Sequence, residues 1–286
     1  MKKKTLVYIL TFAVCITLIL FTSFVVKMEN DGEFDKQTDG TASSTVSPVS
    51  PQTNKPTQDQ SVKQTAVQSS EVNSSSGVKK NLSDYFTSIS TAKVFNNELQ
   101  IYISSQVAFS GNSVKMTAEK LPTKYISGKV ESKFAFRYGE FHFRVNCVKG
   151  KGLFPAIWLM PTNGELFPEI DIFEMLGSNP NTVTGVMHYM QNNEQKKYSY
   201  SHSFPKDNIP KSYDIKFKWT KDSMTWTVNG KQMLKVSENV PNIPMYLIFN
   251  LAVGGDWPGS PDTSTVFPSS FNVTILDIKP QEIFSR

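Results

Sequence analysis

The feature that most constrains the fold is an alternation of apolar and polar residues that recurs between residues 134 and 275. Every second residue of the segment 213–219 is Tyr, Ile, Phe or Trp, and the segments 141–147 and 271–275 show the same alternation. Successive side chains of a β-strand point to opposite faces, so this pattern indicates half-buried antiparallel strands. Because no comparable helical stripe is visible, the sequence predicts an all-β domain over residues 81–286.

Turn residues and one apolar run refine this prediction. Asn229 and Gly230 lie between two alternating segments, and a two-residue hairpin turn requires positive φ at both positions. The alternation changes register at Gly139, which indicates a turn or bulge there. Residues 246–253 are almost continuously apolar, as expected of a strand covered on both faces. Short strands separated by such turn residues are typical of a β-sandwich or barrel.

The N-terminus has the pattern of a translocation signal. Lysines occupy positions 2–4, and residues 5–26 carry no charge and are rich in Leu, Ile, Val and Phe. This run of 22 residues is long enough for the ~20 that cross a bilayer, so residues 1–26 are predicted to be an uncleaved signal-anchor with everything after Val26 outside the cell. The alternative is a long signal peptide cut near Thr22 and Ser23, which would give a secreted protein.

Residues 27–80 are predicted to be a disordered linker. They consist of Ser, Thr, Gln, Asn, Pro and scattered charges, and aromatic residues are nearly absent after Phe34. Such a segment cannot bury enough apolar area to offset the entropy of ordering. The composition changes near Asn81, where we place the start of the folded domain.

Charge and metal-ligating residues exclude several classes of function. The 30 basic and 25 acidic side chains leave a formal net charge of +5, partly in the N-terminal lysines, so nucleic acid is not an expected partner. His142, His188 and His202 show no transition-metal ligand spacing to one another or to Cys147. Cys15 lies within the predicted anchor, so no disulfide with Cys147 is expected.

Three carboxylates lie within six residues of one apolar segment. In FPEIDIFEMLG (residues 167–177), Glu169 and Asp171 would share one strand face, while Glu174 would point to the other. A solvated acidic face is the simpler interpretation, but the surrounding Phe and Ile residues indicate a buried strand. Two carboxylates kept in different protonation states are what glycoside hydrolysis requires, one as nucleophile and one as acid.

Four segments together resemble one enzyme family. The motif E-x-D-x-x-E at residues 169–174 accompanies SGKVESK (127–133), GKGLFPAIWLMP (150–161) and NLAVGGDWPG (250–259). In this order they resemble glycoside hydrolase family 16, in particular its laminarinase-like endo-β-1,3-glucanases. The resemblance implies a β-jelly-roll sandwich of two curved antiparallel sheets with a concave cleft. It also implies that Glu169 is the nucleophile, Glu174 the general acid/base, and Asp171 a carboxylate that assists the nucleophile.

The spacing of the two glutamates imposes a condition on the strand. Glu169 and Glu174 are five residues apart, so a regular strand would place them on opposite faces. A bulge near Ile172 and Phe173 must restore the register, and the two carboxyls should then lie about 5–5.5 Å apart, the geometry of a retaining enzyme. Lichenase-type members of the family have a shorter E-x-D-x-E motif that needs no bulge, which favours a β-1,3-glucanase here.

Aromatic and polar residues near these segments are candidates for sugar binding, because flat rings pack on glucan rings and polar groups bind the hydroxyls. Asn250 is a polar side chain in an apolar strand and needs a partner, either a ligand hydroxyl or a backbone group. Trp219 and Trp226 continue alternating patterns and are predicted to be structural. The substrate-binding candidates are Phe167, Trp158, His188, Asn250, Trp257, Tyr138 and Arg137.

The sequence therefore predicts a retaining endo-β-1,3-glucanase displayed outside the cell. The expected partner is a β-glucan, the expected state is a monomer, no cofactor is required, and a structural calcium is left open. Three alternatives remain at this point. They are a hydrolase or transglycosylase of another β-glycan (mixed-linkage glucan, galactan or xyloglucan), a noncatalytic glucan-binding lectin, and a wall-scaffolding protein.

Overall fold

A computed structural model describes residues 81–286. The predicted signal-anchor (1–26) and linker (27–80) lie outside these residues. Within the described part of the chain, no helix is long and apolar enough to span a membrane. The elements in this part are almost all strands, which confirms the all-β prediction.

The elements follow one another in this order. The first are η1 (Leu82–Asp84), β1 (Phe86–Ser88), β2 (Gln100–Tyr102), η2 (Ser104–Gln106), β3 (Val107–Ser110), β4 (Ser113–Lys120) and β5 (Tyr125–Ser127). The central ones are β6 (Lys129–Asn146), β7 (Leu153–Pro161), β8 (Glu169–Glu174), β9 (Thr182–Gln191) and β10 (Glu194–Ser203). The last are η3 (Lys206–Asn208), β11 (Ser212–Trp219), β12 (Met224–Val228), β13 (Lys231–Val236), β14 (Met245–Val253) and β15 (Ser269–Ser285).

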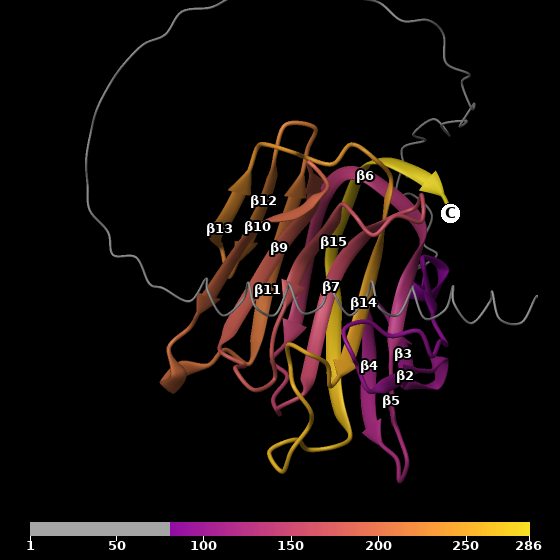
Figure 1. Cartoon of the computed structure of the whole chain (residues 1–286). Coiled ribbons are helices and arrows are strands. Elements are labelled where there is room, and N and C mark those ends of the chain that lie inside the picture. The colour runs from indigo at the N-terminus through magenta and orange to yellow at the C-terminus, as the bar shows by residue number, and fades with distance from the viewer. Residues whose placement is uncertain (1–80) are drawn as a thin grey trace, which may run out of the picture. The chain divides into compact units, whose positions relative to one another are not determined.

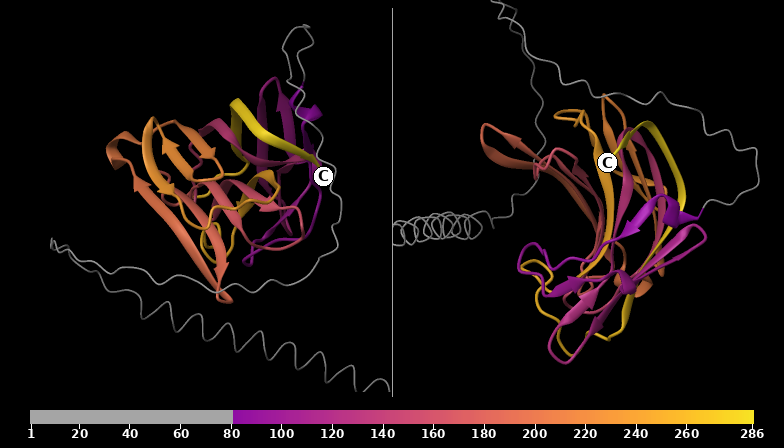
Figure 2. Two further views of the ribbon diagram at one scale, coloured as in Figure 1. Left: turned by 90° about the horizontal axis from the view of Figure 1, so that it is seen from above. Right: turned by 90° about the vertical axis from the view of Figure 1, so that its right-hand side faces the viewer.

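The strands pair in the order β10-β9-β8-β7-β14-β6-β15-β4-β5-β2, with β11, β12 and β13 branching from β6. Figures 1 and 2 show that they curve into two facing layers. The first half of β6 pairs with β14, and its second half pairs with β11. This one long strand therefore passes from the layer that contains β8 to the layer that contains β11 and β12.

The core lies between the two layers. Phe173 of β8 stacks on Phe271 of β15 with 5.9 Å between ring centroids. The apolar residues of the alternating segment in β11 are fully buried, as predicted: Tyr213, Ile215, Phe217 and Trp219. Burying such aromatic side chains supplies most of the hydrophobic stabilisation of a sandwich of this kind.

Two local predictions are confirmed and a third, the turn or bulge at Gly139, is wrong. Asn229 and Gly230 have φ of 48° and 80° and join β12 to β13, and β14 is buried on both faces. At Gly139, however, there is neither a turn nor an extra residue, because β6 continues through it in register with β15, with positive φ at Tyr138 and Gly139. A Cβ on Gly139 would lie 2.8 Å from the carbonyl oxygen of Lys279, so a glycine is required where β6 changes layers.

Candidate active site

A bulge interrupts β8 in the middle of the acidic segment. On the β7 side, Asp171 pairs with Trp158 and Phe173 with Ile157, so Ile172 is an extra residue. On the β9 side, the register shifts between Asp171 and Glu174. The bulge predicted near Ile172 and Phe173 is therefore present.

The bulge places all three carboxylates on one face of the sheet. Glu169, Asp171 and Glu174 pair with His188, Val186 and Thr184 of β9, respectively. These three partners are each two residues apart, so they share a face of β9, and directly paired residues share a face of the sheet. We call this surface, which carries Glu169, Asp171 and Glu174, the acidic face.

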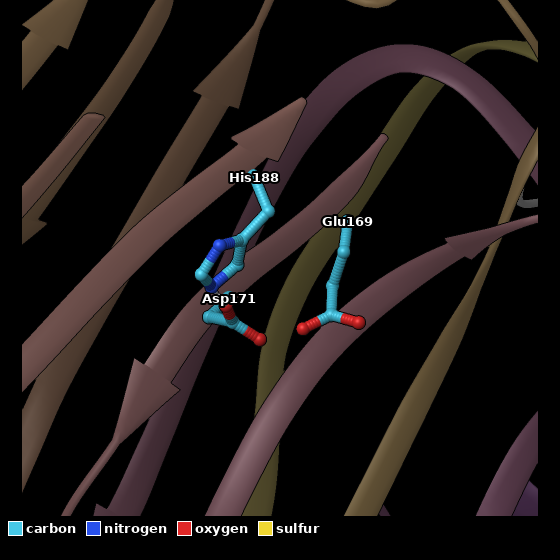
Figure 3. A group of neighbouring side chains, drawn as sticks. All are labelled: Glu169, Asp171 and His188. Atoms are coloured by element: carbon cyan, nitrogen blue, oxygen red, sulfur yellow. Dashed lines mark ion pairs between the residues drawn. The ribbon is translucent and has the colours of Figure 1, made fainter. Parts of the chain in front are cut away.

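His188 completes a close group with two of the carboxylates. Oxygen atoms of Glu169 and Asp171 and a ring nitrogen of His188 all lie within 4.8 Å of one another, and Figure 3 shows the three side chains converging. His188 Nε2 is 3.5 Å from Asp171 Oδ2. Sequence spacing did not reveal this group, because strand pairing creates it. By distance it could hold a metal ion, but both carboxylates also belong to the predicted catalytic set.

The three carboxyl groups cannot all ionise near neutral pH. Burial raises the pKa of Glu169 to about 7. Burial, together with the charge of Glu169, raises the pKa of Glu174 to about 8. Burial and both neighbouring glutamates raise the pKa of Asp171 well above its usual range. Of the two glutamates, Glu169 has the lower pKa and loses its proton first, while Glu174 keeps its proton to higher pH.

His188 is neutral near pH 7 because burial and the charge of Lys197 lower its pKa to about 4. Its Nδ1 lies 3.1 Å from the side-chain nitrogen of Gln195. An amide nitrogen can only donate, so Nδ1 accepts and the imidazole proton sits on Nε2, facing Asp171. Sequence reasoning missed Gln195 and Lys197, although the Asn192-Asn193 pair could have indicated the β9–β10 hairpin that places them.

The raised pKa of Glu174 predicts that this carboxyl costs stability at alkaline pH. From about pH 4.5, its ordinary value, up to about pH 8, the folded state binds more protons than the unfolded state, so the free energy of unfolding falls as pH rises. Glu174→Gln should therefore raise the free energy of unfolding by roughly 2–4 kcal/mol at pH 9 and leave it nearly unchanged at pH 4. Denaturant melts at both pH values measure this difference.

The matched control is Glu140→Gln, which removes an exposed carboxylate that pairs with Lys218 on the surface. This substitution should shift the melting curve little at either pH, since exposed pairs contribute little to stability. A Glu174→Gln variant with the same stability gain at pH 4 and pH 9 would contradict the raised pKa.

Trp158 is held on the acidic face by a network of side chains. Its indole Nε1 donates to Asn250 Oδ1 at 2.8 Å, and Asn250 Nδ2 donates to the Tyr102 hydroxyl at 3.1 Å. Trp158 lies directly opposite Asp171 in the β7–β8 ladder, and Lys129 Nζ is 5.9 Å from the centre of its ring. Two side chains are thus partners of Asn250, whereas the sequence led us to expect a ligand hydroxyl or a backbone group; its role in substrate binding stays a prediction.

Phe167 and Trp257 lie beside this face. The Phe167 ring is 6.4 Å from the His188 ring. Trp257 is 50% exposed and packs edge-on against Phe154, which alternates with Trp158 along β7 and so shares its face. The fold therefore gathers these two aromatic residues around the carboxylates, where their role in sugar binding stays a prediction.

Arg137 and Tyr138 have contacts elsewhere. Arg137 Nε donates to Glu282 of β15 at 3.1 Å, and the Tyr138 ring packs edge-on against the buried Trp219 at 5.3 Å. Both residues lie where β6 changes layers, which directs Tyr138 toward the core. The structure does not bring these two side chains to the group formed by Glu169, Asp171 and His188.

Comparisons with known proteins agree with the sequence resemblance. A family model described as "Glycosyl hydrolases family 16" matches residues 94–267. The chain is 29% identical over 184 residues to glucan endo-1,3-beta-glucosidase A1 of Niallia circulans, covering 56% of this chain and 27% of that protein. It is 29% identical over 181 residues to endo-1,3-1,4-beta-glycanase EglC of Rhizobium meliloti, covering 56% of this chain and 38% of that protein. The chain thus spans less than half the length of these two relatives.

Solved structures with this fold include two glucanases. The laminarinase catalytic domain from Thermotoga maritima is similar with a TM-score of 0.60 and 25% identity, covering 71% of this chain and 92% of that chain. The endo-beta-1,3-glucanase from Pyrococcus furiosus has the same TM-score and identity, covering 71% of this chain and 90% of that chain. The similarity extends over nearly the whole of these two structures.

Proposed function

Because the chain belongs to glycosyl hydrolase family 16, we propose that it is an endo-acting glucanase that cleaves β-1,3-linked glucans by double displacement with retention. The observation that carries this proposal is the bulge in β8, which brings Glu169 and Glu174 to one face of the sheet. Two carboxyls on one face can act on the same glycosidic bond, whereas the regular strand would have separated them.

The two glutamates have the protonation order that the reaction needs. Glu169 has the lower pKa and is the nucleophile that attacks the anomeric carbon, breaking the glycosidic bond. Glu174 has the higher pKa and donates its proton to the departing oxygen. In the second step Glu174 takes a proton from water, which attacks the anomeric carbon and releases Glu169. Side chains of the chain itself perform each step, so the mechanism needs no cofactor.

Asp171 and His188 support the nucleophile. Asp171 is buried, and its Oδ2 has no hydrogen-bond partner within the described residues other than the 3.5 Å contact with His188. With its raised pKa, Asp171 can hold a proton beside Glu169 and donate it in a hydrogen bond that orients the attacking oxygen. The neutral His188 fixes the position of Asp171 without adding a full charge to the group.

The proposed substrate is a β-glucan chain lying across the acidic face. Trp158, Phe167 and Trp257 offer aromatic surface for sugar rings around the carboxylates. The names of the relatives, an endo-1,3-beta-glucosidase and an endo-1,3-1,4-beta-glycanase, support a glucan with β-1,3 linkages. We further propose, from residues 1–26, that an N-terminal anchor displays the enzyme outside the cell.

A substrate panel tests this proposal. We expect the full-length chain to release reducing ends from laminarin and to produce oligosaccharides early in the reaction, as an endo-acting enzyme does. Mixed-linkage glucan, agarose and xyloglucan separate the alternative hydrolases, and product length separates hydrolysis from glycosyl transfer. Binding to laminarin without release of reducing ends would favour a lectin and contradict the proposal.

A further inference from the structure

A tryptophan of the opposite layer contacts the backbone of the catalytic strand. Trp226 lies on β12, which pairs with β11 and β13 and not with β8. Its side chain is fully buried, and its indole Nε1 donates a hydrogen bond of 3.0 Å to the carbonyl oxygen of Asp171. The contact therefore joins the two layers at the middle carboxylate of the site.

This hydrogen bond lies at the bulge itself. Asp171 is the last regularly paired residue before the extra residue Ile172, and the register shifts in both ladders immediately after Asp171. A bulge disrupts the ladder locally, and a buried peptide group is costly unless it has a hydrogen-bond partner. Trp226 supplies such a partner at the point where the ladders become irregular.

A glycine makes room for this tryptophan. Gly185 of β9 lies between Thr184 and Val186, the residues that pair with Glu174 and Asp171. A Cβ on Gly185 would lie 2.9 Å from Cδ1 of Trp226 and 2.4 Å from the ring of Tyr200. A side chain at position 185 would therefore force both the Tyr200 ring and the indole of Trp226 beneath the bulge to shift.

We propose that Trp226 is a positioning residue that fixes the bulge at Ile172 and thereby holds Glu174 beside Glu169. The inference deepens the proposed function and rests on it. Without the indole N–H, the extra residue can move to a neighbouring position in β8, which turns Glu174 away from the glycosidic bond. Trp158 is held by Asn250 and Trp257 packs on Phe154, contacts that do not involve β8, so substrate binding is preserved while the chemical step slows.

Trp219 provides a matched control. It is fully buried in the adjacent strand β11, and its Nε1 also donates to a backbone carbonyl, that of Pro241, at 3.1 Å. Pro241 lies outside β8. Trp219→Phe and Trp226→Phe therefore remove the same indole and one buried hydrogen bond from the same layer, and differ in whether the lost bond reached the catalytic strand.

The test compares kcat, KM and the pH profile of kcat/KM on laminarin, with thermal melts of each variant to choose a temperature at which all are folded. For Trp226→Phe we expect kcat to fall about 10–100-fold and KM to change less than about 3-fold. The alkaline limb of the pH profile should also move, because the charge of Glu169 no longer acts on Glu174 at the same distance. Trp219→Phe should keep kcat and the pH profile within about 2-fold of wild type while also lowering the melting temperature.

A second variant keeps the inference testable if Trp226→Phe does not fold. Gly185→Ala retains the indole of Trp226 but forces it to shift. It should therefore reduce kcat with little change in KM, as Trp226→Phe does. The inference is overturned if Trp226→Phe or, failing that, Gly185→Ala keeps wild-type kcat, or if Trp219→Phe loses as much. An inactive wild-type chain in the same assay would instead contradict the proposed function.

Discussion

Glu169→Gln should leave a folded protein whose kcat on laminarin is lower by on the order of 10⁴-fold or more. The amide cannot form the covalent bond to the anomeric carbon, so the first step of double displacement is lost. The loss should be equally severe with an aryl β-glucoside that carries a good leaving group, because attack by the nucleophile is needed whatever the leaving group is. Steady-state kinetics on both substrates measure it.

The control for this variant is again Glu140→Gln, whose carboxylate pairs with Lys218 and lies on β6. It should retain wild-type kinetics. Removal of a nucleophile should cost more than about 100-fold in kcat. If Glu169→Gln kept more than about a hundredth of wild-type kcat, Glu169 would not be the nucleophile.

Glu174→Gln should have a different profile, since the residue it removes transfers protons. On laminarin, kcat should fall about 10²–10⁴-fold, because a sugar alkoxide is a poor leaving group unless it is protonated as it departs. On a dinitrophenyl β-glucoside the first step should remain fast, because that leaving group departs without protonation. The second step should then limit the rate, so a burst of dinitrophenol should precede slow turnover.

Azide offers an independent check on Glu174. This anion attacks the glycosyl-enzyme without a general base, so it should accelerate turnover of Glu174→Gln and yield a β-glycosyl azide. The same concentration of azide should not restore Glu169→Gln, which cannot form that intermediate. Equal losses of Glu174→Gln on both substrates, with no effect of azide, would contradict the acid/base assignment.

The sequence predicted the parts of the fold that depend on local pattern. Alternation in residues 213–219 identified a strand and its buried face, because the period of two follows directly from strand geometry. The bulge was predictable for a similar reason, since an odd spacing between Glu169 and Glu174 is incompatible with a shared face in a regular strand.

Contacts between strands and between layers could not be predicted in the same way. The hydrogen bond from Gln195 to His188 depends on the register of a hairpin, and that from Trp226 to Asp171 depends on how two layers stack. The partners of Asn250 likewise come from two other strands. No spacing in one dimension encodes these distances, which is why Trp226 was interpreted as a purely structural residue.

The central proposal is that the bulge brings two carboxyls to one glycosidic bond, so that Glu169 attacks the sugar directly and no water takes part in the first step. The most direct measurement is the anomeric configuration of the first product, followed by proton NMR while laminarin is hydrolysed faster than the product mutarotates. The proposed double displacement predicts that the β-anomer appears first and the α-anomer only later. An α-anomer formed first would show direct attack by water and contradict the proposal.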